Sequence, residues 1–302
     1  MFHTDFWDGV DHPILFFDSG IGGLPYFKRF RERNAAACAD GDIGGSVGGC
    51  AGYASGSSAM YIADREHFPY GHKTRKEIAD ILIRLAAELL KHVEPQAAVL
   101  ACNTASVSAL DALREMFPSI PWVGTVPAIK PAALASKTRC VGVIGTDRTI
   151  EDPYIMELAR KYSPDAKIVG LAASDIVRFV EEGGERAPEA EKERMVFPYI
   201  EQLRAAGADT LALGCTHFLL LLDTFRRLAM PDIVVFDSVE GVVHRIEEVL
   251  ESTPDRGHRA AGAVLLLTGS APIEPLWRER ARAFGLDIRR LDSRRVPEKA
   301  FE

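Results

Sequence analysis

The sequence has no excess of basic charge, because 36 Lys and Arg residues face 43 Asp and Glu residues and give the 302-residue chain a formal net charge of −7. Nucleic-acid-binding proteins usually carry a basic face or stripe, so we expect no nucleic-acid partner. The longest strongly apolar stretches, residues 210–222 and 263–267, are too short to span a bilayer. The first residues are acidic and lack a basic segment, which predicts no secretory signal and a cytoplasmic protein outside the membrane.

Cysteine is scarce, with five residues in the chain. No two of them have the C-x-x-C spacing of a structural zinc site or a redox motif, so we expect no metal site. In the cytoplasm these thiols should be reduced and free of disulfides. Their chemistry is then that of single thiols: Cys38, Cys50, Cys102, Cys140 and Cys215.

Apolar runs alternate with amphipathic stretches along the whole chain, which is typical of an α/β protein with parallel strands. The strands are expected at residues 14–17, 60–63, 97–101, 122–124, 140–145, 167–171, 210–213, 233–236 and 263–267. The helices are expected at residues 24–33, 73–92, 104–117, 151–162, 174–182, 189–206, 217–229, 239–251 and 274–284. A chain of this length is sufficient for two domains.

The pattern of elements repeats, because residues 14–24 and 140–150 both run from a strand through a polar turn into a helix. We therefore predict two pseudo-symmetric, doubly wound parallel-sheet domains with the active site in the cleft between them. The first domain is expected to comprise residues 1–125 plus 237–302, and the second residues 126–236. Residues 34–59 are rich in Ala, Gly and Ser, which predicts a surface loop or insertion.

Two cysteines lie in matching settings in these two halves. Residues 98–104 read AVLACNT and residues 211–217 read LALGCTH, so each cysteine follows an apolar run and precedes a helix-like stretch. A single cysteine in such a place is usually a buried small hydrophobe. The repetition suggests instead that two thiols are brought to one site from two halves. A helix N-terminus lowers the pKa of a neighbouring thiol, so we expect both thiols to ionise more readily than usual.

Three further motifs are weaker when taken alone. Residues 18–23, DSGIGG, join a strand to a helix at the place where anions bind, although Pro25 breaks a dinucleotide fingerprint and a plain turn remains an alternative. The Pro69-Tyr70-Gly71 segment is either a loop over a pocket or a simple turn. His217 would reach Cys215 only in a turn that precedes the helix, because side chains two residues apart on a helix do not face each other.

Taken together, the motifs resemble one known family. FFDSGIGGL, FPYG, ACNTAS, GTVPAIKPA, VGVIGTDRTI, LGCTHFLLL and DSVEGV occur in this order within residues 14–245. They resemble the cofactor-independent glutamate racemases of the Asp/Glu racemase superfamily. ACNT with GCTH is typical of the superfamily, and DSGxGG with PYG of the glutamate branch. The chain departs from the family in its longer segment 34–59 and in Phe218-Leu219, where Tyr-Pro is usual.

This resemblance implies an isomerase that interconverts L- and D-glutamate without a cofactor and supplies D-glutamate for peptidoglycan, as a homodimer. It implies that Cys102 and Cys215 are the two acid/base thiols, tuned by Asp18 and His217 respectively. Glu181 is implied as an additional acidic residue, although Glu182 is adjacent. The implied substrate contacts are Asp18, Ser19, Pro69, Tyr70, Gly71, Cys102, Asn103, Thr104, Thr149, Cys215, Thr216 and His217.

Inversion at Cα needs a base on one face of the substrate and an acid on the other, which two opposed thiols supply. The short motifs around Ser19, Cys102 and Cys215 contain no Lys or Arg, and this suggests that the α-carboxylate is recognised by neutral donors at two helix starts. Since no pyridoxal fingerprint or metal-binding cluster is visible, we expect neither a cofactor nor a metal.

Other functions stay open at this point. An aspartate or hydantoin racemase of the same superfamily would use both thiols, whereas a decarboxylase needs one protonating cysteine and would not require the pair. A thiol hydrolase built on Cys215 and His217 would leave Cys102 dispensable. A two-domain amino-acid-binding protein would use the cleft and need neither thiol.

Overall fold

The computed structural model describes residues 12–39, 58–253 and 262–291, and its strands form two parallel sheets, as predicted. The first sheet has the strand order β10 (Asp287–Leu291), β9 (Ala263–Thr268), β2 (Ala59–Ala63), β1 (Ile14–Asp18), β3 (Ala97–Leu100) and β4 (Trp122–Gly124). The second has the order β6 (Lys167–Ala172), β5 (Cys140–Gly145), β7 (Thr210–Leu213) and β8 (Val234–Phe236).

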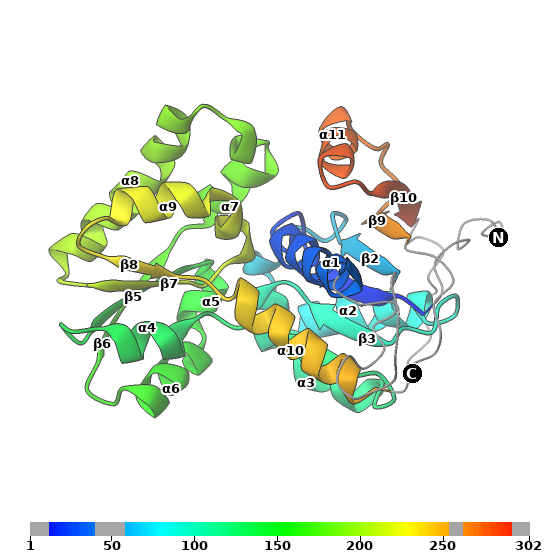
Figure 1. The fold of residues 1–302 in the computed structure, drawn as a ribbon, viewed down its shortest axis with the longest axis horizontal. Helices are drawn as coiled ribbons and strands as arrows, with labels where there is room; N and C mark the ends of the chain where they lie inside the picture. Colours follow the sequence, from blue (N-terminus) through cyan, green and yellow to red (C-terminus); the bar gives the residue numbers. More distant parts are fainter. Residues whose placement is uncertain (1–11, 40–57, 254–261, 292–302) are drawn as a thin grey trace.

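Helices surround both sheets (Figure 1). Those around the first sheet are α1 (Leu24–Ala39), α2 (Arg75–Leu89), α3 (Asn103–Met116), α10 (Val239–Glu251) and α11 (Pro275–Ala283). Those around the second are α4 (Ile129–Ala135), α5 (Asp147–Glu151), α6 (Pro153–Tyr162), α7 (Ser174–Glu181), α8 (Glu189–Ala205) and α9 (Leu222–Ala229). The described part of the chain also contains three short 3-10 helices: η2 (Tyr70–His72), η3 (Gly184–Arg186) and η4 (Thr216–Leu221).

The two sheets share one topology, which confirms the predicted repeat. The order β2-β1-β3-β4 in the first sheet matches β6-β5-β7-β8 in the second. Strands β9 and β10, from the C-terminal part of the chain, then extend the first sheet beside β2. The predicted α/β fold with two doubly wound sheets is therefore observed, whereas the exact domain boundaries at residues 125 and 237 remain a prediction.

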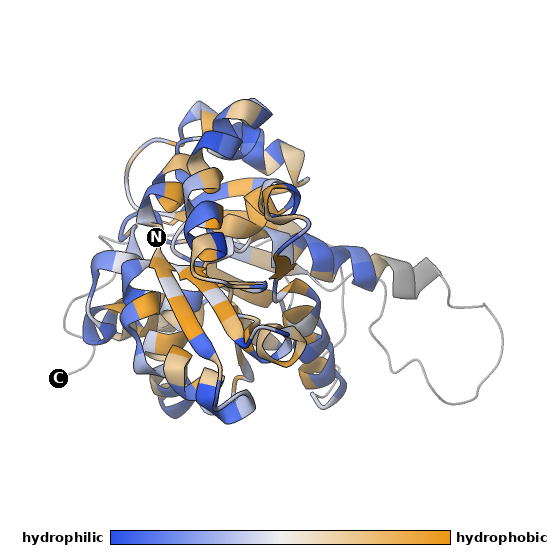
Figure 2. Cartoon of the chain, turned by 90° about the vertical axis from the view of Figure 1, so that its left-hand side faces the viewer, coloured by the Kyte–Doolittle hydropathy of each residue, from blue (hydrophilic) through white to orange (hydrophobic). Residues whose placement is uncertain are grey.

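The central strands are the most apolar segments of the chain because neighbouring strands and helices cover them on both faces. All five residues of β1 and of β2 are buried. The edge strand β6, in contrast, is exposed or half-buried along its length. Figure 2 shows the same distribution, with hydrophobic residues concentrated in the central strands and hydrophilic residues on the outer faces of the helices.

Strand β10 and helix α4 are among the elements that were not predicted, and each lacks the usual signal. Strand β10 reads DIRRL and lies at a sheet edge, where one face stays wet and charged side chains are tolerated. Helix α4 contains Pro131 in its first turn, where proline is compatible with a helix because the backbone N–H there has no helical partner.

Other predictions need correction. Residues 34–39 do not belong to a loop but extend α1, because alanine favours helix even where glycine and serine follow. Ala59 begins β2, and residues 40–57 of the expected loop lie outside the described residues. The expected helix 217–229 is split into η4 and α9, and the helix expected from residue 151 is preceded by α5 and begins at Pro153.

Helix α2 begins with a capping box, which yields a stability prediction. The Thr74 hydroxyl accepts from the Glu77 amide, and the Glu77 carboxylate accepts from the Thr74 amide at 2.7 Å. We expect Thr74→Ala to lower the free energy of unfolding by about 1 kcal/mol in urea denaturation, because a helical N–H loses its acceptor. Thr74→Ser is the matched control and should stay near the parent value; equal losses in both variants would contradict a capping role.

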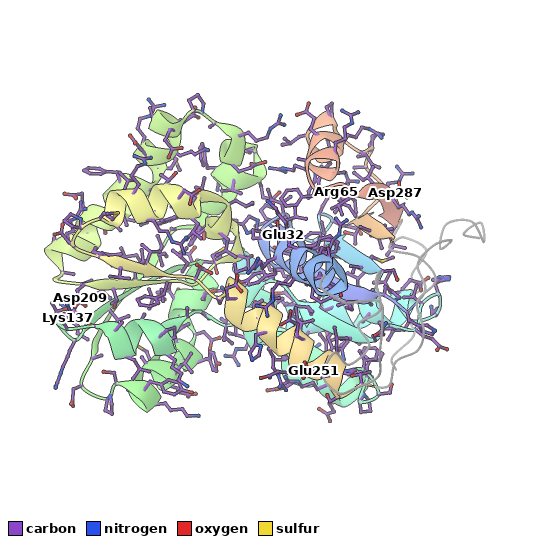
Figure 3. All side chains as sticks on the ribbon, viewed as in Figure 1. Glu32, Arg65, Lys137, Asp209, Glu251 and Asp287 are labelled. Atoms are coloured by element: carbon purple, nitrogen blue, oxygen red, sulfur yellow. The ribbon has the colours of Figure 1, made fainter. Side chains whose placement is uncertain are left out.

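The carboxyl ends of the strands in the second sheet face the first half of the molecule. At the opposite end of that sheet, Asp209 precedes β7 and Lys137 precedes β5, and the Asp209 carboxylate accepts from the Lys137 amide at 2.6 Å. Figure 3 shows both residues at the edge of the sheet that lies far from the first half.

Within the described residues, no helix is long and apolar enough to cross a membrane.

Candidate active site

Each of the two cysteines directly follows a strand that pairs with the first strand of its sheet: β3 beside β1 in the first sheet, and β7 beside β5 in the second. In each sheet the chain crosses from the central strand to its neighbours on opposite sides, and ligands of open α/β sheets bind in the crevice at this switch point. Asp18 ends β1 and Cys102 follows β3 in the first sheet. Thr146 follows β5 and Cys215 follows β7 in the second, so the topology brings both thiols to carboxyl edges of strands.

The two thiols are also equivalent in register. The Ala101 amide donates to the Phe17 carbonyl at 2.7 Å, and the Gly214 amide donates to the Ile144 carbonyl at 2.6 Å. The cysteine after each of these residues has an extended backbone and precedes a helix, with φ −136° at Cys102 and −138° at Cys215. The sequence repeat thus corresponds to a repeat in space.

A cavity of about 280 Å³ contains both thiols in its wall. Its volume suits a small ligand. The two halves of the chain both contribute to its lining. Eight of the site residues that the sequence predicted line it: Ser19, Pro69, Tyr70, Gly71, Cys102, Thr104, Cys215 and His217.

The remaining predicted residues lie behind the cavity wall and are largely buried: Asp18, Asn103, Thr149, Glu181 and Thr216. The Thr149 hydroxyl lies 3.0 Å from that of Thr146 and 3.4 Å from that of Thr104. The side-chain amide of Asn103 is buried without a hydrogen-bond partner among the described residues. An unpaired buried amide is costly, so Asn103 has unused capacity to bind a polar group.

Six cavity residues were missed: Phe68, His72, Thr146, Ser174, Val177 and Arg178. Thr146 could have been found, because it holds the position in the second half that Ser19 holds in the first. No motif pointed to the residues on α7. Arg178 brings a cation to the cavity wall, which the expectation of neutral donors did not include.

The pKa of Cys102 is raised, contrary to the expectation from its place at a helix N-terminus. Burial is the main cause, and the nearby charges of Asp18 and Cys215 act in the same direction. Hydrogen bonds from the backbone amides of Ala105 and Ser19 to the thiol oppose this effect without overcoming it. Sequence reasoning identified the helix terminus but not the loss of solvent, which dominates here.

Cys215 is the first member of a hydrogen-bonded series. Its Sγ lies 3.7 Å from His217 Nδ1, and His217 Nε2 lies 2.7 Å from Glu181 Oε1. The extended backbone at Cys215 supplies the turn that the i, i+2 spacing requires. Although burial acts to lower the pKa of His217, contacts with Cys215 and Glu181 raise it well above its usual value.

Glu181 is held from both halves of the molecule. Besides His217, its Oε1 accepts from the backbone amide of Ile21 at 2.7 Å. Burial raises the pKa of Glu181, but His217, the Ile21 amide and Arg280 together bring it below its ordinary value. The His217–Glu181 pair is therefore charged and lies directly behind Cys215.

Asp18 joins the two halves on the Cys102 side. Its carboxylate accepts from the Gly20 amide at 2.7 Å and from the Thr216 hydroxyl at 3.1 Å. Burial raises its pKa from 3.8 to about 6, and the favourable charge of His217 opposes that rise only in part.

The glycines of the DSGIGG segment allow close packing between the halves. A Cβ atom at Gly20 would lie 1.7 Å from Glu181 Oε1, and one at Gly22 would lie 2.4 Å from Thr216 Oγ1. The Ile21 and Gly23 amides donate to Glu181 and to the Tyr61 hydroxyl, so they are already engaged. Among the described residues, no group of three or more His, Cys, Asp or Glu side chains is arranged to hold a metal ion.

Comparison with known proteins shows that the chain is similar to amino-acid racemases. The profile of the Asp/Glu/Hydantoin racemase family matches residues 49–246. A glutamate racemase of Roseiflexus sp. (strain RS-1) is 31% identical over 270 residues, which are 88% of this chain and 90% of that protein. A glutamate racemase of Pseudomonas paraeruginosa (strain DSM 24068 / PA7) is 32% identical over 285 residues, 91% of this chain and 98% of that protein.

Solved structures agree with the sequence comparison. The crystal structure of Escherichia coli glutamate racemase, in complex with L-glutamate and the activator UDP-MurNAc-Ala, has a TM-score of 0.76 at 27% identity. The match covers 92% of this chain and 97% of that chain.

Proposed function

The chain belongs to the Asp/Glu/Hydantoin racemase family, and from this membership we propose that it is a glutamate racemase that uses two thiols as acid and base. The observation that carries the mechanism is the presence of Cys102 and Cys215 in the wall of one cavity, at equivalent positions of two matching sheets. This arrangement supports proton transfer at both faces of one substrate atom.

In the proposed reaction, the thiolate of one cysteine removes the proton from Cα and becomes a thiol. The thiol of the other cysteine delivers its proton to the opposite face and becomes a thiolate, so one turn inverts Cα and exchanges the protonation states of the pair. The reverse reaction uses the same groups in the opposite roles. Both directions therefore need both cysteines.

The surroundings of each thiol support this division of work. At Cys102, the amides of Ser19 and Ala105 hydrogen-bond sulfur and favour the thiolate, while burial and Asp18 oppose it. A substrate α-ammonium group entering the cavity would supply the positive charge that Cys102 lacks. At Cys215, the charged His217 supplies it from the protein.

Binding of an acidic amino acid is supported by the polar groups in and behind the cavity wall. Ser19, Thr104 and Thr146 present hydroxyls, and Asn103 has an unpaired amide. Arg178 offers a cation for a carboxylate. Such donors, fixed in place before the substrate arrives, stabilise charge that develops on the α-carboxylate as the proton leaves.

The test is incubation with L-glutamate in deuterated water without any cofactor. NMR would follow the loss of the Cα proton, and chiral chromatography would follow D-glutamate. We expect D-glutamate to form with deuterium at Cα, because in deuterated water the thiol that protonates Cα carries a deuteron from the solvent. No exchange with L-glutamate, but exchange with aspartate, would move the chain to another substrate of the same family; no exchange with either would favour an amino-acid-binding protein.

Neither a chelator nor a carbonyl reagent is expected to reduce racemisation, because the proposed acid and base are protein thiols. The measurement is the initial rate after dialysis against EDTA and, separately, after treatment with hydroxylamine. Iodoacetamide is the positive control and should inactivate the enzyme. Inactivation by EDTA that added metal reverses, or by hydroxylamine that pyridoxal phosphate reverses, would contradict the proposed chemistry.

The setting follows from the proposed reaction. Thiol acid–base catalysis needs reduced cysteines, and Cys102, Cys140 and Cys215 are free, so we propose the cytoplasm as the location. The proposed product, D-glutamate, would serve peptidoglycan synthesis. Depletion of the protein from its cell should then make growth depend on added D-glutamate, and growth without that supplement would refute this role.

We also propose that the protein acts as a homodimer. Analytical sedimentation should give twice the chain mass, and a monomer would refute this proposal.

A further inference from the structure

Arg280 is a buried cation on α11, in the C-terminal part of the chain that extends the first sheet. Only 4% of the residue is exposed. Its guanidinium reaches α7, the helix that follows β6 of the second sheet, and donates from Nη2 to the carbonyls of Val180 at 2.7 Å and Glu181 at 3.0 Å. Nε donates to Glu185 Oε1 at 2.9 Å. One side chain therefore connects α11 with the end of α7.

The contacts of Arg280 continue to a thiol of the active site. Its Nη1 lies 3.7 Å from Glu181 Oε2 and has no hydrogen-bond partner among the described residues. The other oxygen of the same carboxylate contacts His217 at 2.7 Å, and His217 lies 3.7 Å from the Cys215 sulfur. The series Arg280–Glu181–His217–Cys215 is therefore continuous.

An arginine suits this place for a geometric reason. Its planar fork can contact two carbonyls and two carboxylates at once, which a lysine ammonium cannot do in the same geometry. Packing of the guanidinium against Trp277, with 5.4 Å to the ring centroid, fixes its plane. Because the desolvation of buried ion pairs offsets much of their attraction, stability alone does not account for such a cluster.

We propose that Arg280 is a positioning residue for the Cys215 side of the reaction: it fixes the Glu181 carboxylate so that His217 stays charged and directed at the Cys215 thiol. This inference rests on the proposed racemase function. Arg280 lies on α11, outside the family motifs, and would connect the first half of the molecule with the Cys215 thiol of the second half.

Several charged or titratable groups face Glu181 or its partners His217 and Arg280, and Arg280 changes their balance. They are Asp18 on β1, Tyr61 on β2, Glu185 on η3, Cys215 and His217 near η4, and Arg280 on α11. Without Arg280, the carboxylates of Glu181 and Glu185 lose the positive charge beside them, so Glu181 should take up a proton at higher pH. The surroundings of Cys215 also become less favourable for a thiolate.

The experiment compares Arg280→Met and Arg280→Lys with Arg282→Met, an exposed arginine on the same helix. We expect Arg280→Met to lower kcat for glutamate by about 10–100-fold, with a smaller change in KM, and to move the acid limb of the pH profile upward. Arg280→Lys should recover part of kcat and keep the acid limb in place. Arg282→Met should behave like the parent.

A second measurement does not depend on turnover. The rates of iodoacetamide alkylation of Cys215 and Cys102, resolved by mass spectrometry, should change only at Cys215, which should react severalfold more slowly in Arg280→Met. If Arg280→Met does not fold, Arg280→Lys must still lower kcat. The role of Arg280 would be overturned if the parent is active and the folded Arg280 variants keep its kcat, its pH profile and its rate of Cys215 alkylation. An inactive parent would instead overturn the proposed function itself.

Discussion

Replacement of either Cys102 or Cys215 with serine is expected to lower kcat for glutamate racemisation by about three orders of magnitude or more, in both directions. Each thiol acts as the base in one direction and as the acid in the other, so the loss of one affects both. A serine hydroxyl is far less acidic than a thiol, and general acid–base groups typically contribute 10²- to 10⁴-fold. The measurement is the initial rate from L- and from D-glutamate by chiral chromatography.

The chain contains a matched control for this prediction. Cys140 is also a free thiol of low exposure, but it begins β5, and its Sγ contacts the Ala206 carbonyl at 3.4 Å. A serine hydroxyl can make the same contact, so Cys140→Ser should fold and retain full activity. Circular dichroism should show that all three variants are folded.

The pattern of losses distinguishes the alternatives. Loss of activity in Cys215→Ser alone would indicate chemistry that needs one thiol assisted by His217, as in a thiol hydrolase, and not a pair. Near-full activity in both variants would exclude a mechanism in which these thiols are the acid and the base. Only loss in both variants, with Cys140→Ser intact, agrees with two opposed thiols.

The parts of this site that could be predicted from the sequence are those that depend on local order along the chain. A strand followed by cysteine and a helix start is visible in residues 98–104 and 211–217, and its repetition implied one cavity with two thiols. A turn before the helix was also foreseen as the condition for a contact between Cys215 and His217. Periodicity likewise located nine of the ten strands among the described residues, since these are apolar and short.

The parts that could not be predicted depend on contacts between distant segments and on burial. The approach of Glu181 to the Ile21 amide joins residues 160 positions apart, and nothing in either segment announces it. Arg280 lies on a helix whose pattern shows only that one face is apolar. The pKa of Cys102 was misjudged for the same reason, because the extent of solvent loss follows from the assembled halves.

Asp18→Asn is expected to separate stability from activity. Burial raises the pKa of Asp18 from its ordinary value of 3.8 to about 6. Each pKa unit is worth about 1.4 kcal/mol, so ionised Asp18 destabilises the folded chain by about 3 kcal/mol. An asparagine can keep the present contacts, because its carbonyl can accept from the Gly20 amide and its amide can donate to the Thr216 hydroxyl.

The sign of the pH dependence follows from the raised pKa. The folded state binds the Asp18 proton more tightly than the unfolded state, so this contribution to stability is fully present below about pH 4 and is lost as the pH rises through about 6. Asparagine does not ionise, so Asp18→Asn keeps this contribution to stability at every pH. The difference in free energy of unfolding between Asp18→Asn and the parent should therefore grow between about pH 4 and pH 7 in favour of the variant.

Activity should change in the opposite direction. The Asp18 charge raises the pKa of Cys102 and so makes its thiolate a stronger base. Removal of that charge should therefore lower kcat by about 100-fold while the fold becomes more stable, which is the expected relation for a group retained for function. Urea denaturation at pH 4, 5.5, 7 and 8, with racemisation rates of the same samples, gives both quantities. A variant that is less stable than the parent at pH 8 would mean that the carboxylate contacts with Gly20 and Thr216 stabilise the fold. A variant as active as the parent would mean that the charge of Asp18 is not needed for activity, and either result would contradict this account.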